Sequence, residues 1–289
     1  MAKAYCALVL FFLSSNIFAA SCCGGGQSAA SLMIADHAQE WTLSTMFRSD
    51  LGQTNNDGKS LMDDDQNKDH TWTQMLEYKR LFGSRFQANA SLSSSQKKAR
   101  RLGREENNSG LADFSVGFFY EAVTNYTYNP WLPRIFIGSK LITPFGENNF
   151  SSQKELRTDI RGSGFYRLDF PVIFVRESLK LSLTPQYFPD QKNLKATQAF
   201  SSAVSYTVSP HEVIDLTTSL QWSHLAKKEF KNQTLISSQF WEVSLSPSWM
   251  YTKNASVNLN YSDTTLLGKS RNSALYRSFS LGATWSELL

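Results

Sequence analysis

The chain contains 289 residues, with 29 Lys or Arg against 25 Asp or Glu and a formal net charge of +4. No segment collects the basic residues on one face, which argues against a nucleic-acid partner. Beyond the N-terminal 21 residues, no apolar run approaches the ~20 residues that a membrane-spanning helix needs. This excludes a helical inner-membrane transporter.

Residues 1–21 have the pattern of a cleaved signal peptide. A positive charge precedes an apolar stretch, and small residues at 19–21 precede a cut before Cys22. The apolar stretch is too short for a membrane anchor. Cys22 at the first mature position also allows lipid acylation, although an Ala stands where a lipobox usually has Leu. We therefore expect an exported protein with a flexible leader over residues 22–39, and we leave acylation of Cys22 open.

The leader begins with two adjacent cysteines, Cys22 and Cys23, followed by three glycines. Neighbouring cysteines are too strained for an ordinary mutual disulfide. With Met33 and His37 nearby, they offer a site for a soft metal as an alternative. A flexible leader rich in small residues explains the same composition and is preferred.

The mature chain alternates apolar and polar residues at period two over twelve segments, which predicts twelve strands. They cover residues 40–49, 71–82, 85–95, 111–124, 132–144, 161–174, 177–188, 195–207, 211–224, 236–252, 255–263 and 274–286. One kind of pattern continues to the end of the chain without a Pro- or Gly-rich linker. Residues 40–289 are therefore predicted to form a single all-β domain.

The clearest pair of strands lies between Gly110 and Gly146. In the first strand the even positions 114–122 are apolar, while the odd positions are mostly polar or small. The second strand repeats the alternation over 134–141. Each is about a dozen residues long, which is what a tilted strand needs to cross a membrane.

Two features favour a transmembrane antiparallel β-barrel over a soluble periplasmic β-sandwich. The polar strand face consists mostly of Ser, Thr, Gln, Asn and Gly, which suits a confined lumen better than bulk water. Long and short connections also alternate, as in barrels with short periplasmic turns and longer outer loops. Dense charge falls in two predicted long loops, which contain residues 97–107 and 227–232. An even number of strands places both ends of the barrel on the periplasmic side.

Aromatic residues recur near the predicted strand ends, where interfacial girdles are expected. They are Trp72, Tyr126, Tyr128, Trp131, Tyr187, Trp222, Trp249 and Tyr251. The last strand has the spacing of Ser280, Gly282 and Trp285 that is typical of outer-membrane barrels, with Leu281, Ala283 and Trp285 on the outer face. The usual terminal aromatic residue is missing.

The segments GLADFSVGFFYEAV and PRIFIGSKLITPFGE resemble the core of a family of outer-membrane barrels described as transporters of the phenol meta-degradation pathway. The matching positions are Gly110, Asp113, Pro144 and Gly146. Phe145 departs from the small polar residue usual in the family, and the likeness is best over residues 110–188. The resemblance implies a passive outer-membrane channel or uptake barrel and no catalysis.

No catalytic constellation stands out, because none of the four His residues has a nucleophile or metal partner at a recognisable spacing. The acidic run 63–69 alternates oxygen ligands as a calcium loop does, but it lacks the central Gly and the closing Glu. We expect no enzyme activity, no cofactor and no bound metal.

The charged residues that alternation turns inward are candidates for the lining of a pore. They are Glu121, Lys140, Arg167, Asp169, Lys180, Asp215 and Glu242. Their mixed signs argue against strong ion selectivity. The same charges could instead pair across a narrow lumen and fill it, and the Gly- and Ser-rich segment 24–31 could enter the lumen as a plug.

The sequence therefore predicts a protein of the outer membrane of a Gram-negative-type cell, surrounded by outer-membrane lipid and inserted by the barrel-assembly machinery. Its predicted function is a passive channel for a small-molecule solute, whose identity the sequence does not reveal. The alternative is a closed-lumen barrel with a structural or surface-interaction role, in which the long loops act outside the cell.

Overall fold

The computed structural model describes residues 32, 37–62, 69–101, 104–124, 132–144, 166–176, 178–191, 194–230, 233–268 and 270–288. The regular secondary structure in these ranges is β-strand, and no helix there is long and apolar enough to cross a membrane. The predicted signal peptide, Cys22, the segment 24–31 and most of the acidic run 63–69 lie outside the described residues.

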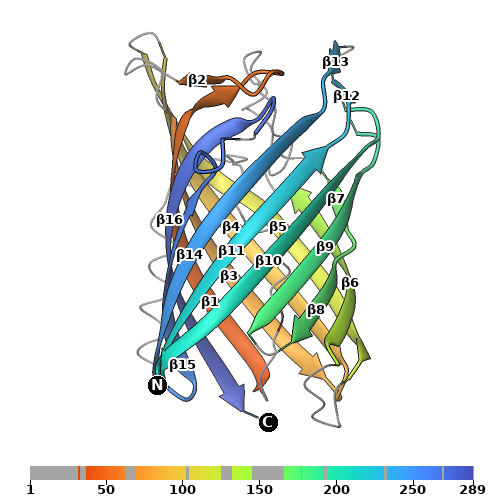
Figure 1. Ribbon diagram of the computed structural model, residues 1–289, viewed down its shortest axis with the longest axis vertical. Helices are drawn as coiled ribbons and strands as arrows, with labels where there is room; N and C mark the ends of the chain where they lie inside the picture. Colours follow the sequence, from red (N-terminus) through yellow and green to blue (C-terminus); the bar gives the residue numbers. More distant parts are fainter. Residues whose placement is uncertain are drawn as a thin grey trace.

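The strands form one closed antiparallel barrel (Figure 1). Neighbouring strands follow the chain order, and the last strand pairs with the first along almost its whole length, from Leu288 opposite His37 to Ala274 opposite Gln53. If the interrupted strand β7/β8 is counted once, twelve strands close the barrel in the described part of the chain. The predicted all-β barrel is confirmed.

The strands have the following bounds. The barrel is formed by β1 (His37–Thr54), β3 (Asp69–Phe82), β4 (Phe86–Arg101), β5 (Arg104–Val123), β6 (Arg134–Pro144), β7 (Arg167–Asp169), β8 (Val172–Arg176), β9 (Leu179–Phe188), β10 (Thr197–His211), β11 (Ile214–Leu225), β14 (Ser238–Thr252), β15 (Ala255–Asp263) and β16 (Ala274–Leu288). The short strands β2 (Ser60–Met62), β12 (Lys228–Phe230) and β13 (Gln233–Leu235) lie beyond one end.

The two ends of the barrel differ in their connections. We call the end at which β1 begins and β16 ends the lower end, as drawn in Figure 1, and the opposite end the upper end. Tight turns join β3 to β4, β10 to β11 and β14 to β15 at the lower end. Gly83 in the first of these turns has a φ of 64°, a left-handed conformation that glycine adopts without strain. The upper end carries β2 and the β12–β13 hairpin.

One predicted long loop is wrong. Residues 96–110 were expected to connect two strands, yet β4 and β5 stay paired up to Arg101 opposite Arg104 and form a projecting hairpin. The apolar residues on the outer face of β4 end at Leu92, and polar side chains follow on both faces. Hydropathy therefore marks where the strand leaves the apolar layer, whereas backbone hydrogen bonding continues further. The predicted loop 225–235 likewise contains the small β12–β13 hairpin.

The predicted strand 161–174 is interrupted. Residues 161–165 lie outside the described ranges, and the remainder forms β7 and β8 with a break at Phe170 and Pro171. Proline has no N–H to donate to a sheet ladder, which accounts for the break. The ends are still tied to the sheet, because Phe170 donates its N–H to Pro185 and the Pro171 carbonyl accepts from Gly138.

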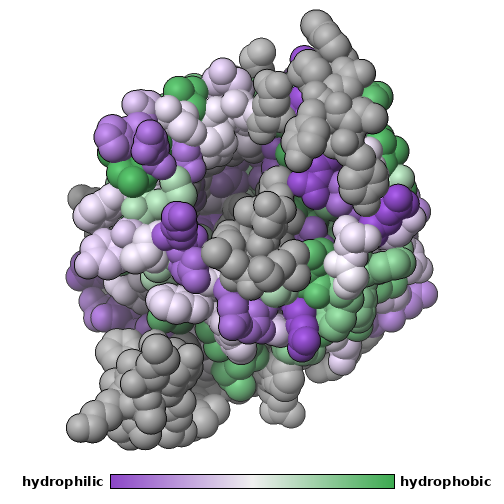
Figure 2. Space-filling model, turned by 90° about the horizontal axis from the view of Figure 1, so that it is seen from below, coloured by the Kyte–Doolittle hydropathy of each residue, from purple (hydrophilic) through white to green (hydrophobic). Residues whose placement is uncertain are grey.

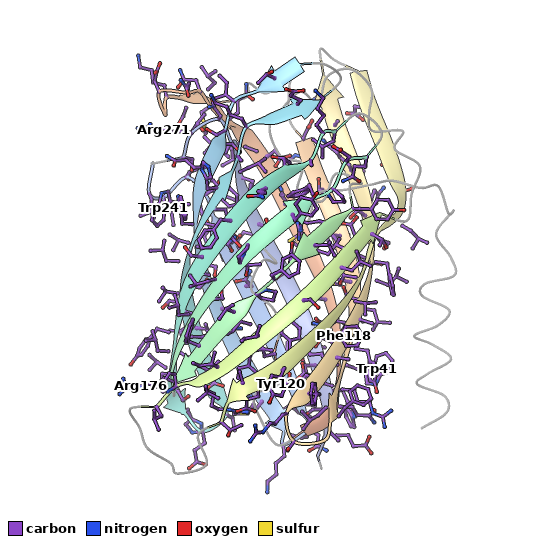
Figure 3. The ribbon with its side chains drawn as sticks, turned by 90° about the vertical axis from the view of Figure 1, so that its right-hand side faces the viewer. Trp41, Phe118, Tyr120, Arg176, Trp241 and Arg271 are labelled. Carbon is purple, nitrogen blue, oxygen red and sulfur yellow. The ribbon has the colours of Figure 1, made fainter. Side chains whose placement is uncertain are left out.

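Side-chain alternation gives the barrel an apolar outer face and a largely polar inner face. The apolar positions predicted for the strands at 111–124 and 132–144 face outward, and Figure 3 shows Trp41, Phe118 and Tyr120 on the outside of the barrel. The expected girdle residues Trp72, Tyr187, Trp249 and Tyr251 are exposed there as well. Tyr126, Tyr128 and Trp131 lie outside the described residues.

Candidate functional site: the inner wall of the barrel

The inner wall holds the side chains predicted to point inward. Glu121, Asp169 and Glu242 are buried, whereas Lys140, Arg167, Lys180 and Asp215 keep part of their surface accessible. The structure does not bring all seven together. Four of them gather on β6, β7 and β9, while Glu121 lies on β5, Asp215 near the lower end of β11 and Glu242 in the upper part of β14.

A charge network centres on Lys79 of β3. Its ammonium contacts the carboxylate of Glu40 on the neighbouring strand and lies 3.6 Å from Oε2 of Glu77. The Lys79 and Glu77 side chains each remain only 7% exposed. Buried charges of this kind are stable only when they are paired, because each ion loses its hydration on burial.

The network extends across the interior of the barrel. Lys140 interacts electrostatically with Glu77 and with Asp169, and Lys180 interacts with Glu77 and Lys79. The strands β3 and β9 are not neighbours, because β4, β5, β6 and β7/β8 separate them on one side. Charges from opposite parts of the wall therefore act on one another across the interior.

The network contains equal numbers of cations and carboxylates. Nε of Arg167 lies 2.8 Å from Oδ1 of Asp169, and Asp113 interacts with both Arg167 and Lys140. The four cations are Lys79, Lys140, Arg167 and Lys180, and the four carboxylates are Glu40, Glu77, Asp113 and Asp169. The predicted residue Glu121 belongs to a separate pair, in which Arg134 donates to both of its carboxylate oxygens at 2.7 and 3.0 Å.

Next to these charges, the inner wall carries an apolar cluster. It contains Phe119, Phe136, Ile173 and Val175 from β5, β6 and β8, and Leu32 of the N-terminal segment packs against them with 9% of its surface exposed. Phe119 also lies over Gly138 of the next strand, where an added Cβ would come within 2.4 Å of the ring. We call the inner faces of β3–β9, with the charge network and this cluster, the filled side.

The opposite wall has a different composition. The inner faces of β10, β11, β14, β15 and β16 carry small hydroxyl and amide side chains, and in their lower halves these stay partly accessible. They include Ser205, Thr207, Thr217, Ser219, Ser244, Ser246, Ser248, Asn258, Asn260, Ser280 and Thr284. We call this wall the hydroxyl side. Figure 2 views the molecule from the lower end and shows many hydrophilic residues on this face.

Hydrogen bonds between neighbouring strands order the hydroxyl side. Oγ of Ser219 lies 2.5 Å from Oγ of Ser244, and Oγ1 of Thr207 lies 2.9 Å from Oγ1 of Thr217. Hydroxyl groups present both donors and acceptors without net charge, and the one carboxylate named on the lower part of this wall, Asp215, accepts a hydrogen bond from Ser209. The wall can therefore hydrate or hold small polar solutes of either sign.

A second apolar cluster lies in the upper part of the interior. Phe188, Ala199 and Leu225 project inward from three adjacent strands and pack with Leu194 of the β9–β10 connection. Beside them the predicted residue Glu242 accepts a 2.7 Å hydrogen bond from the hydroxyl of Tyr276. The guanidinium of Arg48 lies 3.9 Å from the centre of the Tyr276 ring. Among the described residues, the upper half of this wall is thus covered by buried side chains, while the polar side chains of the lower half keep part of their surface accessible.

Sequence reasoning missed several members of the site. Glu40, Glu77 and Lys79 face inward on β1 and β3, but both faces of these strands carry polar residues, so the alternation is blurred. Asp113 shares the face of Glu121, but it was not named among the residues predicted to line the pore. The one available signal was parity, since Lys79 and Glu77 are two residues apart. No group of His, Cys, Asp and Glu that could hold a metal ion occurs within the described ranges.

Comparisons with known proteins bear on the fold. No family model and no curated protein matches the chain. Among solved structures, an outer membrane channel from Pseudomonas putida F1 is similar with a TM-score of 0.67, at 11% identity over 88% of this chain and 97% of that chain. The chain has the fold of an outer-membrane barrel.

Two further solved structures are similar over most of their length. The translocator domain of the autotransporter NalP from Neisseria meningitidis gives a TM-score of 0.51, at 9% identity over 86% of this chain and 88% of that chain. The transport unit of the autotransporter AIDA-I from Escherichia coli gives 0.50, at 13% identity over 90% and 94%. At these identities the likeness concerns the architecture alone.

Proposed function

We propose that the protein is a passive outer-membrane channel for small molecules, with the hydroxyl side as its conducting wall. The observation that carries this proposal is the asymmetry of the interior. The filled side is occupied by paired charges and apolar side chains, whereas the lower hydroxyl side keeps accessible polar groups inside a closed barrel. The similar fold of the outer membrane channel from Pseudomonas putida F1 supports the proposal.

The wall also suggests the class of solute. The charge network is balanced and Glu121 is paired with Arg134, so the filled side should give little preference for cations or anions. The cluster of Phe188, Leu194 and Leu225 is apolar, and an ion that passed along it would lose hydration. Small, weakly polar or aromatic solutes fit both features. The sequence resemblance to transporters of the phenol meta-degradation pathway points to the same class.

The cellular setting follows from the outer face. Exposed aromatic residues at both ends of the strands suit the two interfaces of a lipid bilayer, which supports outer-membrane lipid as the surroundings of the barrel. In this setting the lower end is periplasmic and the upper end, with its longer connections, faces outward. Export by a signal peptide over residues 1–21 and insertion by the barrel-assembly machinery complete the proposal.

A planar-bilayer measurement on refolded protein tests the function. We expect discrete openings of small conductance, with little preference between potassium and chloride, and faster uptake of phenol-sized neutral solutes into vesicles that contain the protein. A heat-modifiable barrel that shows neither conductance nor solute uptake would instead support the closed-lumen structural barrel. The Arg134–Glu121 pair, the charge network and the Leu32 cluster favour that second candidate, because they fill one side of the interior.

A further inference from the structure

The outer face of the barrel carries a row of polar and charged residues near its upper end. Strand register places Asp263, Arg277, Ser49, His70 and Lys98 next to one another, one on each of β15, β16, β1, β3 and β4. By alternation all five point outward, on the same face as the apolar residues of these strands. We call Arg277, His70 and Lys98 among them the basic row.

An aromatic row lies two residues nearer the centre of the barrel wall. It consists of Tyr261, Phe279, Phe47 and Trp72 on consecutive strands. The rings of Tyr261 and Phe279 are 4.9 Å apart and those of Phe47 and Trp72 are 6.1 Å apart, and Phe279 is 60% exposed. Such rings mark the interface between the apolar layer and the lipid headgroups. The basic row therefore lies at headgroup level.

The buried carboxylate of Asp263 holds the Arg277 side chain in place. Oδ2 of Asp263 accepts a 2.8 Å hydrogen bond from Nε of Arg277, and the Asp263 side chain is only 1% exposed. Asp263 also accepts from the backbone N–H and the hydroxyl of Thr265, both at 2.6 Å, and from the hydroxyl of Tyr261 at 2.8 Å. The Arg277 side chain nevertheless remains 52% exposed. Its guanidinium is thus fixed at one nitrogen and directed toward the lipid.

A guanidinium in this position suits one ligand chemistry. An Arg on the lipid face is costly in the apolar layer and is tolerated at the interface, where its planar fork matches a phosphate group in bidentate geometry. Exposed Lys98 extends the positive charge, whereas Arg100, two residues further along β4, stands opposite the exposed Glu105 of β5. We propose that the basic row binds the phosphate groups of an anionic glycolipid in the outer leaflet, with the aromatic row against its sugar and upper acyl chains. This inference rests on the proposed outer-membrane location.

The test uses refolded full-length protein in detergent micelles, titrated with bisphosphorylated lipid A and followed by native mass spectrometry. Matched titrations use the same lipid with both phosphates removed and inorganic phosphate as competitor. The variants are Arg277→Gln, Lys98→Gln and Arg176→Gln. Arg176 is the control, because it points outward from β8 at the lower end of the barrel (Figure 3).

We expect the phosphorylated lipid to bind roughly tenfold more tightly than the dephosphorylated one, since charge-assisted hydrogen bonds to phosphate are lost with the phosphates. Arg277→Gln should remove most of that difference, Lys98→Gln a smaller part and Arg176→Gln none. Free phosphate should not compete. Equal binding of both lipids, competition by free phosphate, or an equal loss in all three variants would overturn the inference.

The proposed function can fail separately. Conductance is measured in phospholipid bilayers without the glycolipid, so a conducting barrel that does not distinguish the two lipids overturns only the lipid site. A chain that forms no heat-modifiable barrel overturns the proposed location itself.

Discussion

The filled side and the hydroxyl side are built by the same alternation of side chains. The filled side buries long side chains in the interior of the barrel, whereas the hydroxyl side leaves short polar side chains partly accessible. On the filled side, Lys79 and its carboxylates, together with Phe119 and Phe136, meet in the interior and leave little accessible surface. On the hydroxyl side, short Ser, Thr and Asn side chains stop close to the wall. In the proposed channel, solutes would therefore pass along one wall of the twelve-stranded barrel.

The largest effect is expected from breaking the charge network. Lys79→Met removes the cation between Glu40 and Glu77 and leaves two buried carboxylates without it. Loss of one partner from a buried ionic pair costs about 3–5 kcal/mol. Urea unfolding from lipid vesicles measures this free energy. Lys253→Met in the exposed β14–β15 turn is the matched control and should change it little. Equal stability of the two variants would show that the filled side is not held by these charges.

A second comparison sets the two faces of one strand against each other. Leu220 points to lipid and is 39% exposed there, while the adjacent Ser219 faces the interior on the hydroxyl side. Leu220→Arg should destabilise the folded barrel by about 2–4 kcal/mol, since Arg is costly in the middle of the membrane. Ser219→Arg keeps its charge in an aqueous space and should cost far less. Refolding yields in vesicles measure both effects. If Ser219→Arg were the more damaging change, the assignment of lipid and interior to the two faces of β11 would be wrong.

Adding one methyl group at a glycine on each side compares how tightly the two sides are packed. An alanine at position 138 would place its Cβ 2.4 Å from the Phe119 ring and 2.9 Å from the backbone oxygen of Phe118. An alanine at 282 would meet only the side-chain amide of Asn258, a partly accessible group that can shift more easily than a ring packed against backbone. We expect Gly138→Ala to cost about 1–3 kcal/mol, as overpacking does, and Gly282→Ala to cost less. Similar losses in denaturant titrations would contradict the proposed difference in packing.

The smallest effect is expected outside the barrel wall. Lys195 pairs with Glu229 beyond the upper end, and this hydrogen bond raises the pKa of the exposed lysine. A raised lysine pKa contributes stability that is fully present below the ordinary lysine value of about 10.4 and is lost only above it. Lys195→Ala should therefore leave the unfolding midpoint, and its pH dependence in the neutral range, close to those of the wild type. A clear shift would mean that this connection supports the barrel.

The sequence predicts the fold well wherever only one strand face is polar. The strands β9, β11 and β14 have strict alternation, and their orientation in the structure agrees with it. Prediction is weaker where both faces carry polar groups, as with Gln74 and Thr73 on β3. It also fails for the β4–β5 extension, because hydrogen bonding between strands does not depend on hydropathy.

The division of the interior could not be predicted from the sequence. Phe119, Phe136 and Ile173 are apolar residues at inward positions, and alternation alone assigns such positions to polar side chains. Which of them meet depends on the register and closure of the whole barrel. Leu32 is far from the other members of this cluster in the sequence, so their contact leaves no periodic signal.

The central claim is that solutes pass along the hydroxyl side. Single-channel conductance of Ser246→Trp tests it most directly, because Ser246 faces the accessible interior from β14 and the adjacent Leu245 faces lipid. We predict that Ser246→Trp lowers the conductance severalfold while the barrel stays folded, and that Leu245→Trp leaves the conductance unchanged. Unchanged conductance in Ser246→Trp, in a barrel shown to be folded by heat modifiability, would contradict the claim.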